Sequence, residues 1–419
     1  MNISLTDMKF IHRRLANAND SNIRHNGGES KQPPPTNQNK TDAKSKGKKS
    51  SSKKSAKESA EEQAGYLINQ RKILLTNYLS ATKTLKVEPT PEIIHQMEIH
   101  ESVEWSKEDR DAAMGALLSI VSDGNRLGPG NMRALCCAIS GRWLSTTVDS
   151  PSFAPHYELL LHLAINKGEI GSTGARAVAA LLETKTCSLR TLRLLSNNIG
   201  QLGCQALGNA LSFSGGNKSL VELYIDGDTS VGDAGCIELC NRLELNSSLK
   251  VLSLSSCSIT TPSAACAVGA MLTSIRCGLQ YISLECNTLG GPGIEALCTS
   301  GFLTLQVLNL ASTGVNANDS LMAVAALGRA IRSSKLLQAV DFNLNVITLD
   351  AAASLSDSLV KARRDGSKID EFVVTTILDH RSYQSLALDP SMMNSWTSRM
   401  RENKNSPFRR TPTPSPFLK

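Results

Sequence analysis

The sequence predicts an α/β fold of the solenoid type, in which strand–loop–helix units stack side by side into an arc. The stretch Leu189–Leu211 carries alternating leucines, then an asparagine, then apolar residues at helical spacing. Similar stretches recur along the middle of the chain. A unit of this kind cannot bury its apolar face alone, so the copies must pack against one another.

The copies are placed by the first of the two alternating leucines in each. Successive positions lie 26 to 32 residues apart, which suits repeats that contain a helix. The first copy is interpreted with a two-residue insertion after its asparagine. The seven copies are anchored at Leu161, Leu192, Leu223, Leu252, Ile282, Leu308 and Val340, and a strand-like run follows at Phe372.

Each residue type in the unit has a physical role. The alternating leucines point from a short strand into the core, and glycines suit the loop that leads to the helix. A polar residue follows the strand, where its side chain can satisfy backbone groups of the turn. These positions are Asn166, Asn197, Asp228, Cys257, Asn287, Thr313 and Asn345.

The long repeat, with the pattern I-G-x-x-G-x-x-A-L, resembles the ribonuclease-inhibitor-like subfamily of leucine-rich repeat proteins over about residues 157–374. The resemblance implies a leucine-rich repeat solenoid with a curved parallel β-sheet inside and helices outside. It also implies about seven repeats with caps at both ends. It specifies no function, because this repeat class serves many unrelated binding tasks.

Composition divides the chain into six segments. Lysine-rich and proline-rich ends cannot bury enough apolar surface to offset the entropy lost on ordering, so we expect both tails to be disordered. The segments are 1–57, a lysine-rich tail; 58–100, helical; 101–156, a helical cap with a degenerate repeat; 157–366, the repeats; 367–392, a C-terminal cap; and 393–419, a basic proline-rich tail.

Three helices are expected before the repeats. The first covers Glu58–Ala81, and the second begins at Thr90, where a cap residue precedes a proline. The third covers Glu108–Val121 behind Ser106. Residues 127–139 look like the back half of a degenerate repeat. We expect segment 101–156 to cover the open edge of the first strand.

The charge of the chain is unevenly distributed. Its formal net charge is +7, but residues 31–57 carry +8 and residues 393–419 carry +5. Residues 1–30 carry +1, so residues 58–392 are acidic, with a net charge of −7. This distribution argues against a folded body built to bind nucleic acid.

Cysteine usage favours a reducing compartment, the cytosol or the nucleus. All eleven cysteines lie between Cys136 and Cys298, with no C-x-x-C pair. Several occupy positions that the repeat fills with small apolar side chains, so we expect buried free thiols. These are Cys204, Cys236, Cys257 and Cys266.

No combination of residues typical of catalysis stands out. The seven histidines show no metal-ligand spacing with cysteine, and no phosphate-binding G-x-x-x-x-G-K-[ST] loop is present. The sequence contains no run of about 18 apolar residues, so it predicts no transmembrane helix. We therefore expect a protein that is not an enzyme and that needs neither cofactor nor metal.

The surface most suited to binding is the concave side of the predicted sheet. Tyr224 and Tyr281 would be aromatic anchors and charged neighbours would set orientation, because aromatic and arginine side chains dominate many interfaces. The same residues also fit a sheet face that is only solvated. The candidate partner-binding residues are His162, Arg193, Tyr224, Asp226, Tyr281, Glu285, Asn309 and Asp341, with His162 placed in the column of Arg193 and Tyr224.

These features favour a non-enzymatic scaffold that binds a partner protein on its concave face, in the cytoplasm and within a cytoskeletal or flagellar assembly. The alternative is a regulator of an enzyme, since ribonuclease inhibitor and the Ran GTPase-activating protein share this repeat class. That activator carries an acidic segment after its repeats, where this chain carries a basic one. An innate-immune sensor is a third possibility, but no nucleotide-binding domain precedes the repeats.

The tails admit further roles. The lysine tract fits a nuclear import signal, an electrostatic tether to an acidic surface such as tubulin tails or nucleic acid, or a solubilising segment. Thr411, Thr413 and Ser415 each precede a proline near Arg409 and Arg410. Phosphorylation there would reduce the positive charge of the tail.

Overall fold

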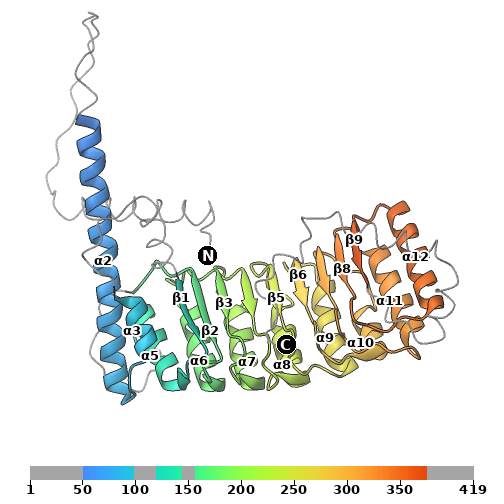
Figure 1. The fold of residues 1–419 in the computed structure, drawn as a ribbon, viewed down its shortest axis with the longest axis horizontal. Helices are drawn as coiled ribbons and strands as arrows, with labels where there is room; N and C mark the ends of the chain where they lie inside the picture. Colours follow the sequence, from blue (N-terminus) through green and yellow to red (C-terminus); the bar gives the residue numbers. More distant parts are fainter. Residues whose placement is uncertain (1–50, 99–118, 144–155, 375–419) are drawn as a thin grey trace, which may run out of the picture.

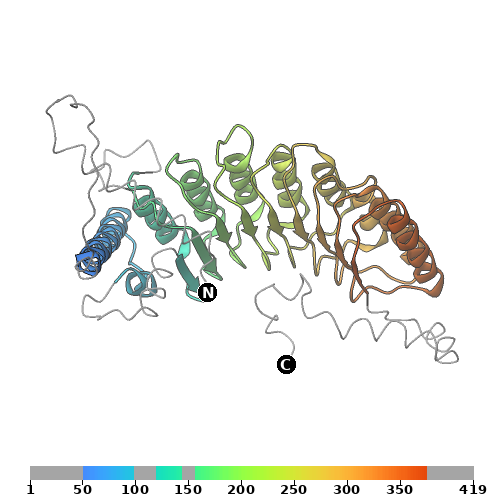
Figure 2. The same cartoon turned by 90° about the horizontal axis from the view of Figure 1, so that it is seen from above.

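The computed structural model describes residues 51–98, 119–143 and 156–374. These residues form an arc in which strands and helices alternate (Figure 1). Seen from above, the strands line the inner, concave side and the helices of the repeats form the outer, convex side (Figure 2).

The elements follow the repeat closely. The strands are β1 (Ser119–Asp123), β2 (His162–Asn166), β3 (Thr191–Arg193), β4 (Glu222–Tyr224), β5 (Val251–Ser253), β6 (Tyr281–Ser283), β7 (Val307–Asn309), β8 (Ala339–Asp341) and β9 (Glu371–Val373). The helices are α2 (Ser51–Leu85), α3 (Pro91–Met97), α5 (Gly128–Ser140), α6 (Gly171–Leu182), α7 (Gly200–Leu211), α8 (Gly232–Leu243), α9 (Pro262–Thr273), α10 (Gly290–Leu297), α11 (Ser320–Ser333) and α12 (Leu349–Arg364).

The nine strands pair in chain order as one parallel sheet. Leu192, Leu223, Leu252 and Ile282 lie directly opposite one another on neighbouring strands, and each is 0% exposed. The leucines therefore form the continuous core that a lone unit could not build. The predicted α/β leucine-rich repeat solenoid is confirmed.

In five of the repeats, the polar residue after the strand bonds the backbone of the preceding repeat. Asn287 Oδ1 accepts from the N–H groups of Cys257 and Ile259, both at 3.0 Å, and its Nδ2 donates to the Leu254 carbonyl at 2.8 Å. These groups would otherwise be buried without partners. Equivalent bonds to the preceding repeat are made by Asn197, Asp228, Cys257 and Asn345, while Thr313 bonds within its own repeat.

The first copy is shifted by two residues from its predicted placement. Leu163 pairs with Leu192, so the anchor is Leu163 rather than Leu161, and no insertion follows the strand. Asn166 therefore lies on β2 itself, opposite Asp123. Its prediction as a repeat asparagine is wrong. The leucines at 159, 160, 161 and 163 made two placements of the pattern equally good in sequence.

Gly168 occupies the polar position of the first copy. Its N–H donates to Asn197 Oδ1 at 2.9 Å. A Cβ at Gly168 would lie 2.6 Å from Ile165 Cγ2, so the site has no room for an asparagine. As between later repeats, the side chain that spans these two repeats comes from the second of them, here Asn197.

Residues 119–143 form a repeat unit of their own. β1 pairs with β2, α5 packs on α6, and Ile120 and Leu127 are buried in the common core. Residues 119–121 are thus a strand and not the end of the predicted helix over Glu108–Val121; residues 101–118 and 144–155 lie outside the described part. Residues 119–123 pair with β2, so segment 101–156 covers the open edge of the first predicted strand, as expected, by adding a strand of its own.

The open edge of β1 is covered by a side chain from α3. Gln96 Oε1 accepts from the Val121 N–H at 2.8 Å, and its Nε2 donates to the Val121 carbonyl. On the same helix, Glu92 accepts from Ser122 Oγ at 2.8 Å. The amide of Gln96 thus takes the place of a neighbouring strand on an edge that would otherwise expose unpaired backbone groups.

Helix α2 packs against α5 with its C-terminal half, where Leu74, Tyr78 and Ala81 are buried. Its N-terminal half extends beyond the repeats (Figure 1). The helix begins at Ser51, so residues 51–57 are helical, contrary to their expected place in a disordered tail. Residues 1–50 and 375–419, which include Thr411, Thr413 and Ser415, lie outside the described part.

The eleven cysteines, all within the described residues, form no disulfide. Cys204, Cys236 and Cys257 are buried as expected, and burial raises the pKa of Cys204 to about 12. Cys266 is exposed, contrary to expectation, because α9 turns the neighbouring Ala264, Ala265 and Val268 toward the core.

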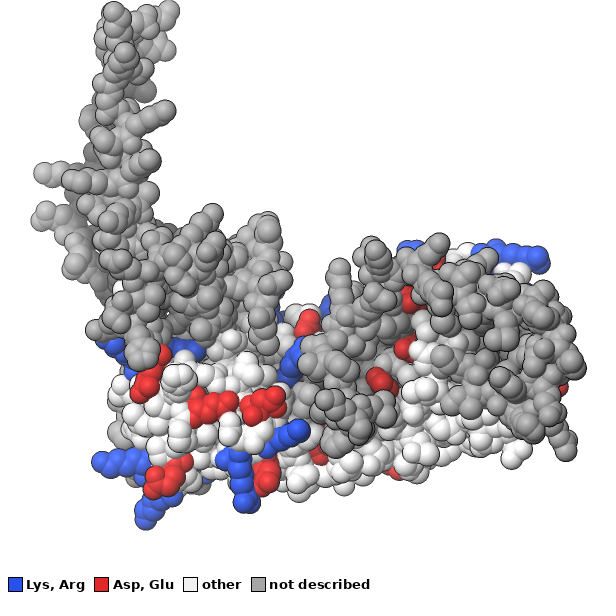
Figure 3. All heavy atoms as spheres, viewed as in Figure 1, with Lys and Arg blue, Asp and Glu red and all other residues white. Residues whose placement is uncertain are grey.

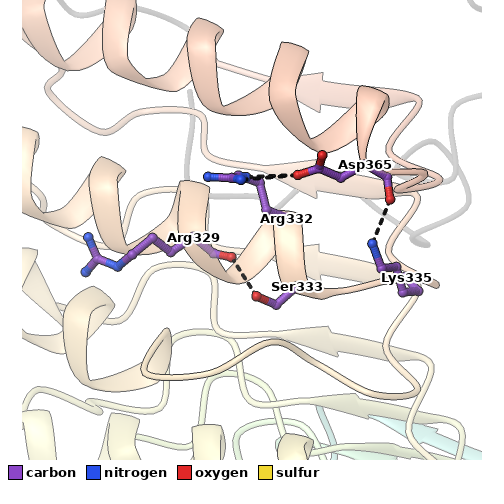
Figure 4. Close-up of polar contacts among 5 residues, drawn as sticks. All are labelled: Arg329, Arg332, Ser333, Lys335 and Asp365. Atoms are coloured by element: carbon purple, nitrogen blue, oxygen red, sulfur yellow. Dashed lines mark hydrogen bonds and ion pairs between the residues drawn. The ribbon is translucent and has the colours of Figure 1, made fainter.

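Polar contacts join the C-terminal ends of α11 and α12 (Figure 4). Arg332 Nη2 lies 3.2 Å from Asp365 Oδ2, and Lys335 Nζ donates to the Asp365 carbonyl at 2.8 Å. Within α11, Ser333 Oγ donates to the Arg329 carbonyl at 3.2 Å. The side chains of Arg332 and Asp365 are 46% and 48% exposed, so water weakens this ion pair and the apolar core beneath it provides most of the stability.

Candidate functional site

The concave face is formed by the outward residues of the strands, which stand in columns because the strands are in register. One column contains His162, Thr191, Glu222, Val251, Tyr281, Val307, Ala339 and Glu371, and the next contains Ala164, Arg193, Tyr224, Ser253, Ser283, Asn309, Asp341 and Val373. His162 therefore stands beside Thr191. The prediction that placed it in the column of Arg193 is wrong. The shift of two residues leaves it on the same face.

A third column continues the alternation just past the strands. The Ser196 N–H donates to the Asp226 carbonyl and the Ser256 N–H donates to the Glu285 carbonyl, so these segments remain aligned. The column contains Leu195, Asp226, Ser255, Glu285, Ala311 and Asn343. All eight predicted binding residues thus lie on one face of the sheet.

The charges on this face are separated along the arc. Arg193 lies on β3, near the N-terminal end. From β4 to β9 the three columns contain no lysine or arginine and five acidic residues: Glu222, Asp226, Glu285, Asp341 and Glu371. Figure 3 shows a few separate acidic side chains right of centre on the face seen in Figure 1. Glu222 and Glu371 were missed as site residues, although each shares a column with predicted ones.

Arg193, Tyr224 and Glu222 form a cluster at the boundary between the two halves. The Arg193 guanidinium lies 4.4 Å from the centre of the Tyr224 ring, within cation–π range. The Tyr224 hydroxyl donates to Glu222 Oε2 at 3.4 Å, and Thr191 Oγ1 donates to the same oxygen at 3.2 Å. Burial raises the pKa of Tyr224, and the nearby Glu222 carboxylate adds to the shift. The ring is therefore a neutral, oriented surface at physiological pH.

Asp226 is held by a row of serines. Its Oδ1 accepts from Ser253 Oγ at 2.5 Å and from the Ser255 N–H at 2.8 Å. Ser255 Oγ lies 2.8 Å from Ser283 Oγ, which extends the row to β6. Burial raises the pKa of the Asp226 carboxyl, although these hydrogen bonds and the more distant Arg193 oppose the shift.

The remaining carboxylates continue toward the C-terminal end. Glu285 Oε2 accepts from Asn309 Nδ2 at 3.1 Å. Asp341 Oδ1 accepts from the Asn343 N–H at 2.9 Å. Burial raises the pKa of the Asp341 carboxyl, and the neighbouring charges of Glu285 and Glu371 raise it further. Like charges thus repel one another across β6, β8 and β9, a cost that nothing in the folding of the sheet requires.

The described residues contain no group of three or more His, Cys, Asp or Glu side chains arranged to hold a metal ion. The carboxylates of the concave face are instead spread over the repeats of β4, β6, β8 and β9. A search of the same residues finds no helix with the length and apolar character needed to cross a bilayer.

Comparison with known proteins agrees with this architecture. The family model described as Leucine Rich repeat matches residues 185–208, 245–266 and 279–298. The NACHT, LRR and PYD domains-containing protein 3 of Macaca mulatta is 32% identical over 205 residues, which cover 44% of this chain and 19% of that protein. The ribonuclease inhibitor of Sus scrofa is 34% identical over 142 residues, which cover 34% of this chain and 30% of that protein.

The chain is a leucine-rich repeat protein of the ribonuclease-inhibitor-like kind. It spans less than a third of the length of either relative. A solved structure of the yeast Rad7–Elc1 complex covers 81% of this chain and 96% of its own at 13% identity, and its TM-score of 0.26 is too low to support an argument. The matches to the family model and to the two relatives support the fold and leave the function to be argued from the site.

Proposed function

We propose that this protein is a non-enzymatic scaffold that binds a partner protein on the concave face of its repeats. The observation that carries the proposal is the composition of that face from β3 to β9. It presents two half-buried tyrosines, a stacked arginine and a run of carboxylates held by neighbouring polar groups. Partly buried aromatic and arginine side chains with oriented polar neighbours are the usual anchors of protein interfaces.

The raised pKa values of two carboxyls on this face favour recognition over mere solvation. Asp226 and Asp341 are carboxylates whose pKa values are raised by burial, so each costs folding free energy when ionised. Serine or asparagine at these positions would remove that cost. A surface that retains destabilising charges in a fixed arrangement is typical of a site maintained for binding.

The test is capture of partners from a cell extract by the full chain, compared with the Tyr224→Ala/Tyr281→Ala variant. Both rings lie on the outward side of the sheet, so their loss should leave the core intact while weakening capture about tenfold or more. Leu202→Ala is the matched control, because Leu202 is a large, 60% exposed side chain on α7, on the convex side. Equal capture by all three proteins would contradict the proposal.

A second candidate, regulation of an enzyme through binding, is supported by similarity to a protein whose name states that it inhibits ribonuclease. Assays of ribonuclease activity and of GTP hydrolysis by small GTPases, with and without the full chain, test it. A dose-dependent change that Tyr224→Ala/Tyr281→Ala abolishes would support this candidate over a passive scaffold.

The cellular setting is also a proposal: cytoplasmic, on a cytoskeletal or flagellar structure, with the lysine-rich tail attached to an acidic surface such as tubulin tails. The lysine excess of residues 31–57 supports the tether. Proximity labelling in cells followed by mass spectrometry tests the setting. Labelled proteins drawn from secreted or organelle-lumen pools would contradict it.

A further inference from the structure

Tyr224 on β4 and Tyr281 on β6 stand on either side of β5, in neighbouring columns of the concave face. Neighbouring parallel strands are about 4.8 Å apart, so β4 and β6 are separated by about 10 Å. The β5 residue between them in the Tyr224 column is Ser253, which is almost fully buried at 5% exposure. The two rings therefore flank one shared patch of the concave face.

The polar groups around this patch are hydrogen-bond acceptors. Asp226 uses Oδ1 for Ser253 and Ser255, and no bond is recorded for its Oδ2 among the described residues. Glu285 likewise uses Oε2 for Asn309. Aromatic faces, carboxylates and hydroxyls all attract a cation, and none of the outward residues of β4 to β9 supplies one.

We infer that the patch formed by Tyr224, Asp226, Ser253, Tyr281 and Glu285 binds a lysine or arginine side chain from an extended basic segment of a partner protein. This inference rests on the proposed function and names the chemistry of the partner. Arg193 already stacks on Tyr224, so a cation seated there would lie over the Tyr281 ring and bond the open carboxylate oxygens of Asp226 and Glu285.

The rest of the face suits a segment with more than one basic residue. Asp226, Glu285 and Asp341 follow or lie on β4, β6 and β8, so acidic groups recur on alternate strands, about 10 Å apart. Further cations would lie near Glu285, Asp341 and Glu371, whose charges repel one another in the free protein. Relief of this repulsion favours a basic ligand over a neutral or acidic one.

The experiment measures binding of fluorescently labelled peptides to the full chain by anisotropy. Three synthetic peptides of equal length alternate glycine with lysine, glutamate or serine. The lysine peptide should bind at least about tenfold more tightly than the other two, and its affinity should fall as salt rises from about 50 mM to about 200 mM.

Two double variants then locate the binding. Asp226→Asn/Glu285→Gln keeps an acceptor oxygen for each internal hydrogen bond and should weaken lysine-peptide binding by about tenfold. Glu183→Gln/Asp357→Asn removes the same net charge from exposed residues at the end of α6 and on α12. This control should change the affinity for the lysine peptide by less than about twofold. Equal effects of the two would show attraction by net charge alone and overturn the inference.

The remaining outcomes separate this inference from the proposed function. If the lysine peptide fails to bind while partner capture still depends on Tyr224 and Tyr281, the basic segment is wrong and the binding face stands. If replacing the lysines of residues 44–49 by glutamine tightens peptide binding about tenfold or more, the chain's own tract occupies the patch, and the assignment to a partner is overturned.

Discussion

On the β1 edge of the sheet, the side chain of Gln96 bonds both backbone groups of Val121, and replacing Gln96 with alanine measures how much these bonds contribute to stability. The substitution removes an amide that bonds both the N–H and the carbonyl of Val121. Each net hydrogen bond contributes about 1 kcal/mol, and a partner left unsatisfied costs about 1–3 kcal/mol. Val121 is only half-buried, so water can replace part of the loss. We expect Gln96→Ala to lower the free energy of unfolding by about 1–2 kcal/mol.

Urea unfolding measures the total effect, and hydrogen exchange locates it. A local loss of about 1.4 kcal/mol should speed exchange of the Val121 amide about tenfold, while the Leu252 amide in the middle of the sheet should be unchanged. Gln96→Glu keeps the acceptor for the Val121 N–H but places a carboxylate against the Val121 carbonyl. It should therefore destabilise the protein at least as much as Gln96→Ala at neutral pH.

His95→Ala is the matched control, because His95 is the neighbouring, exposed residue of α3. It should change the stability by less than about 0.5 kcal/mol. If Gln96→Ala and His95→Ala unfold alike and the Val121 amide exchanges at the same rate in both, the edge is covered by something other than Gln96, and the account of the cap fails.

Four other predictions follow from the same contacts. Asn287→Ala should lower the free energy of unfolding by about 3 kcal/mol or more in urea titrations, since it leaves the N–H groups of Cys257 and Ile259 unpaired in the core. Asn166→Ala should lower it by less than about 1 kcal/mol, because the Asn166 Oδ1 has no hydrogen-bond partner among the described residues. Equal losses in the two variants would refute the corrected register. Burial raises the pKa of folded Asp226 above its unfolded value, so the native state binds a proton more readily than the unfolded state, and stability should fall as the pH rises from the unfolded pKa through the folded one. Asp226→Asn should therefore stabilise the protein at neutral pH, with a gain that disappears in acid. Asp233 should behave oppositely: burial works against its charge, but hydrogen bonds from Thr260 and Thr261 lower its pKa, so Asp233→Asn should destabilise at neutral pH and have no effect once the pH falls below the folded pKa, as thermal melts at several pH values can check. Arg332→Ala should cost less than about 1 kcal/mol, since its pair with Asp365 is half exposed; a larger loss would show that the pair organises the last two helices.

The repeats were predictable because their signal is periodic and redundant. The same spacing to a polar residue and a helical run follows each of the anchor residues Leu192, Leu223, Leu252 and Ile282. An error in placing one copy is therefore corrected by its neighbours. The first copy lacks that correction. Leu161 and Leu163 both fit the pattern, and only the pairing of Leu163 with Leu192 decides between them.

Strand β1 was missed for a different reason. Ser122 replaces a core leucine and hides the alternation around Ile120, although Asn125 and Leu127 follow at the offsets of the repeat. The use of Gln96 as an edge cover depends on a contact across 25 residues of chain. Sequence periodicity carries no information about such a contact.

The candidate face could be predicted as a list of residues but not as a site. Alternation along each strand places Tyr224, Asp226 and Glu285 on the outward side. The hydrogen bonds of Asp226, the stacking of Arg193 on Tyr224 and the separation of charge along the arc require the register of neighbouring strands. That register fixes which carboxylates are held, and so which chemistry the face can recognise.

The central claim is that a partner lies against the concave face, and site-specific photo-crosslinking tests it most directly. A photoreactive phenylalanine analogue is placed at Tyr281 in the full chain, and in a second protein at Leu202 on the convex side. We expect ultraviolet light to join the partner to the chain substituted at position 281 and not to the chain substituted at position 202. Crosslinking from position 202 alone would place recognition on the helices and contradict the account.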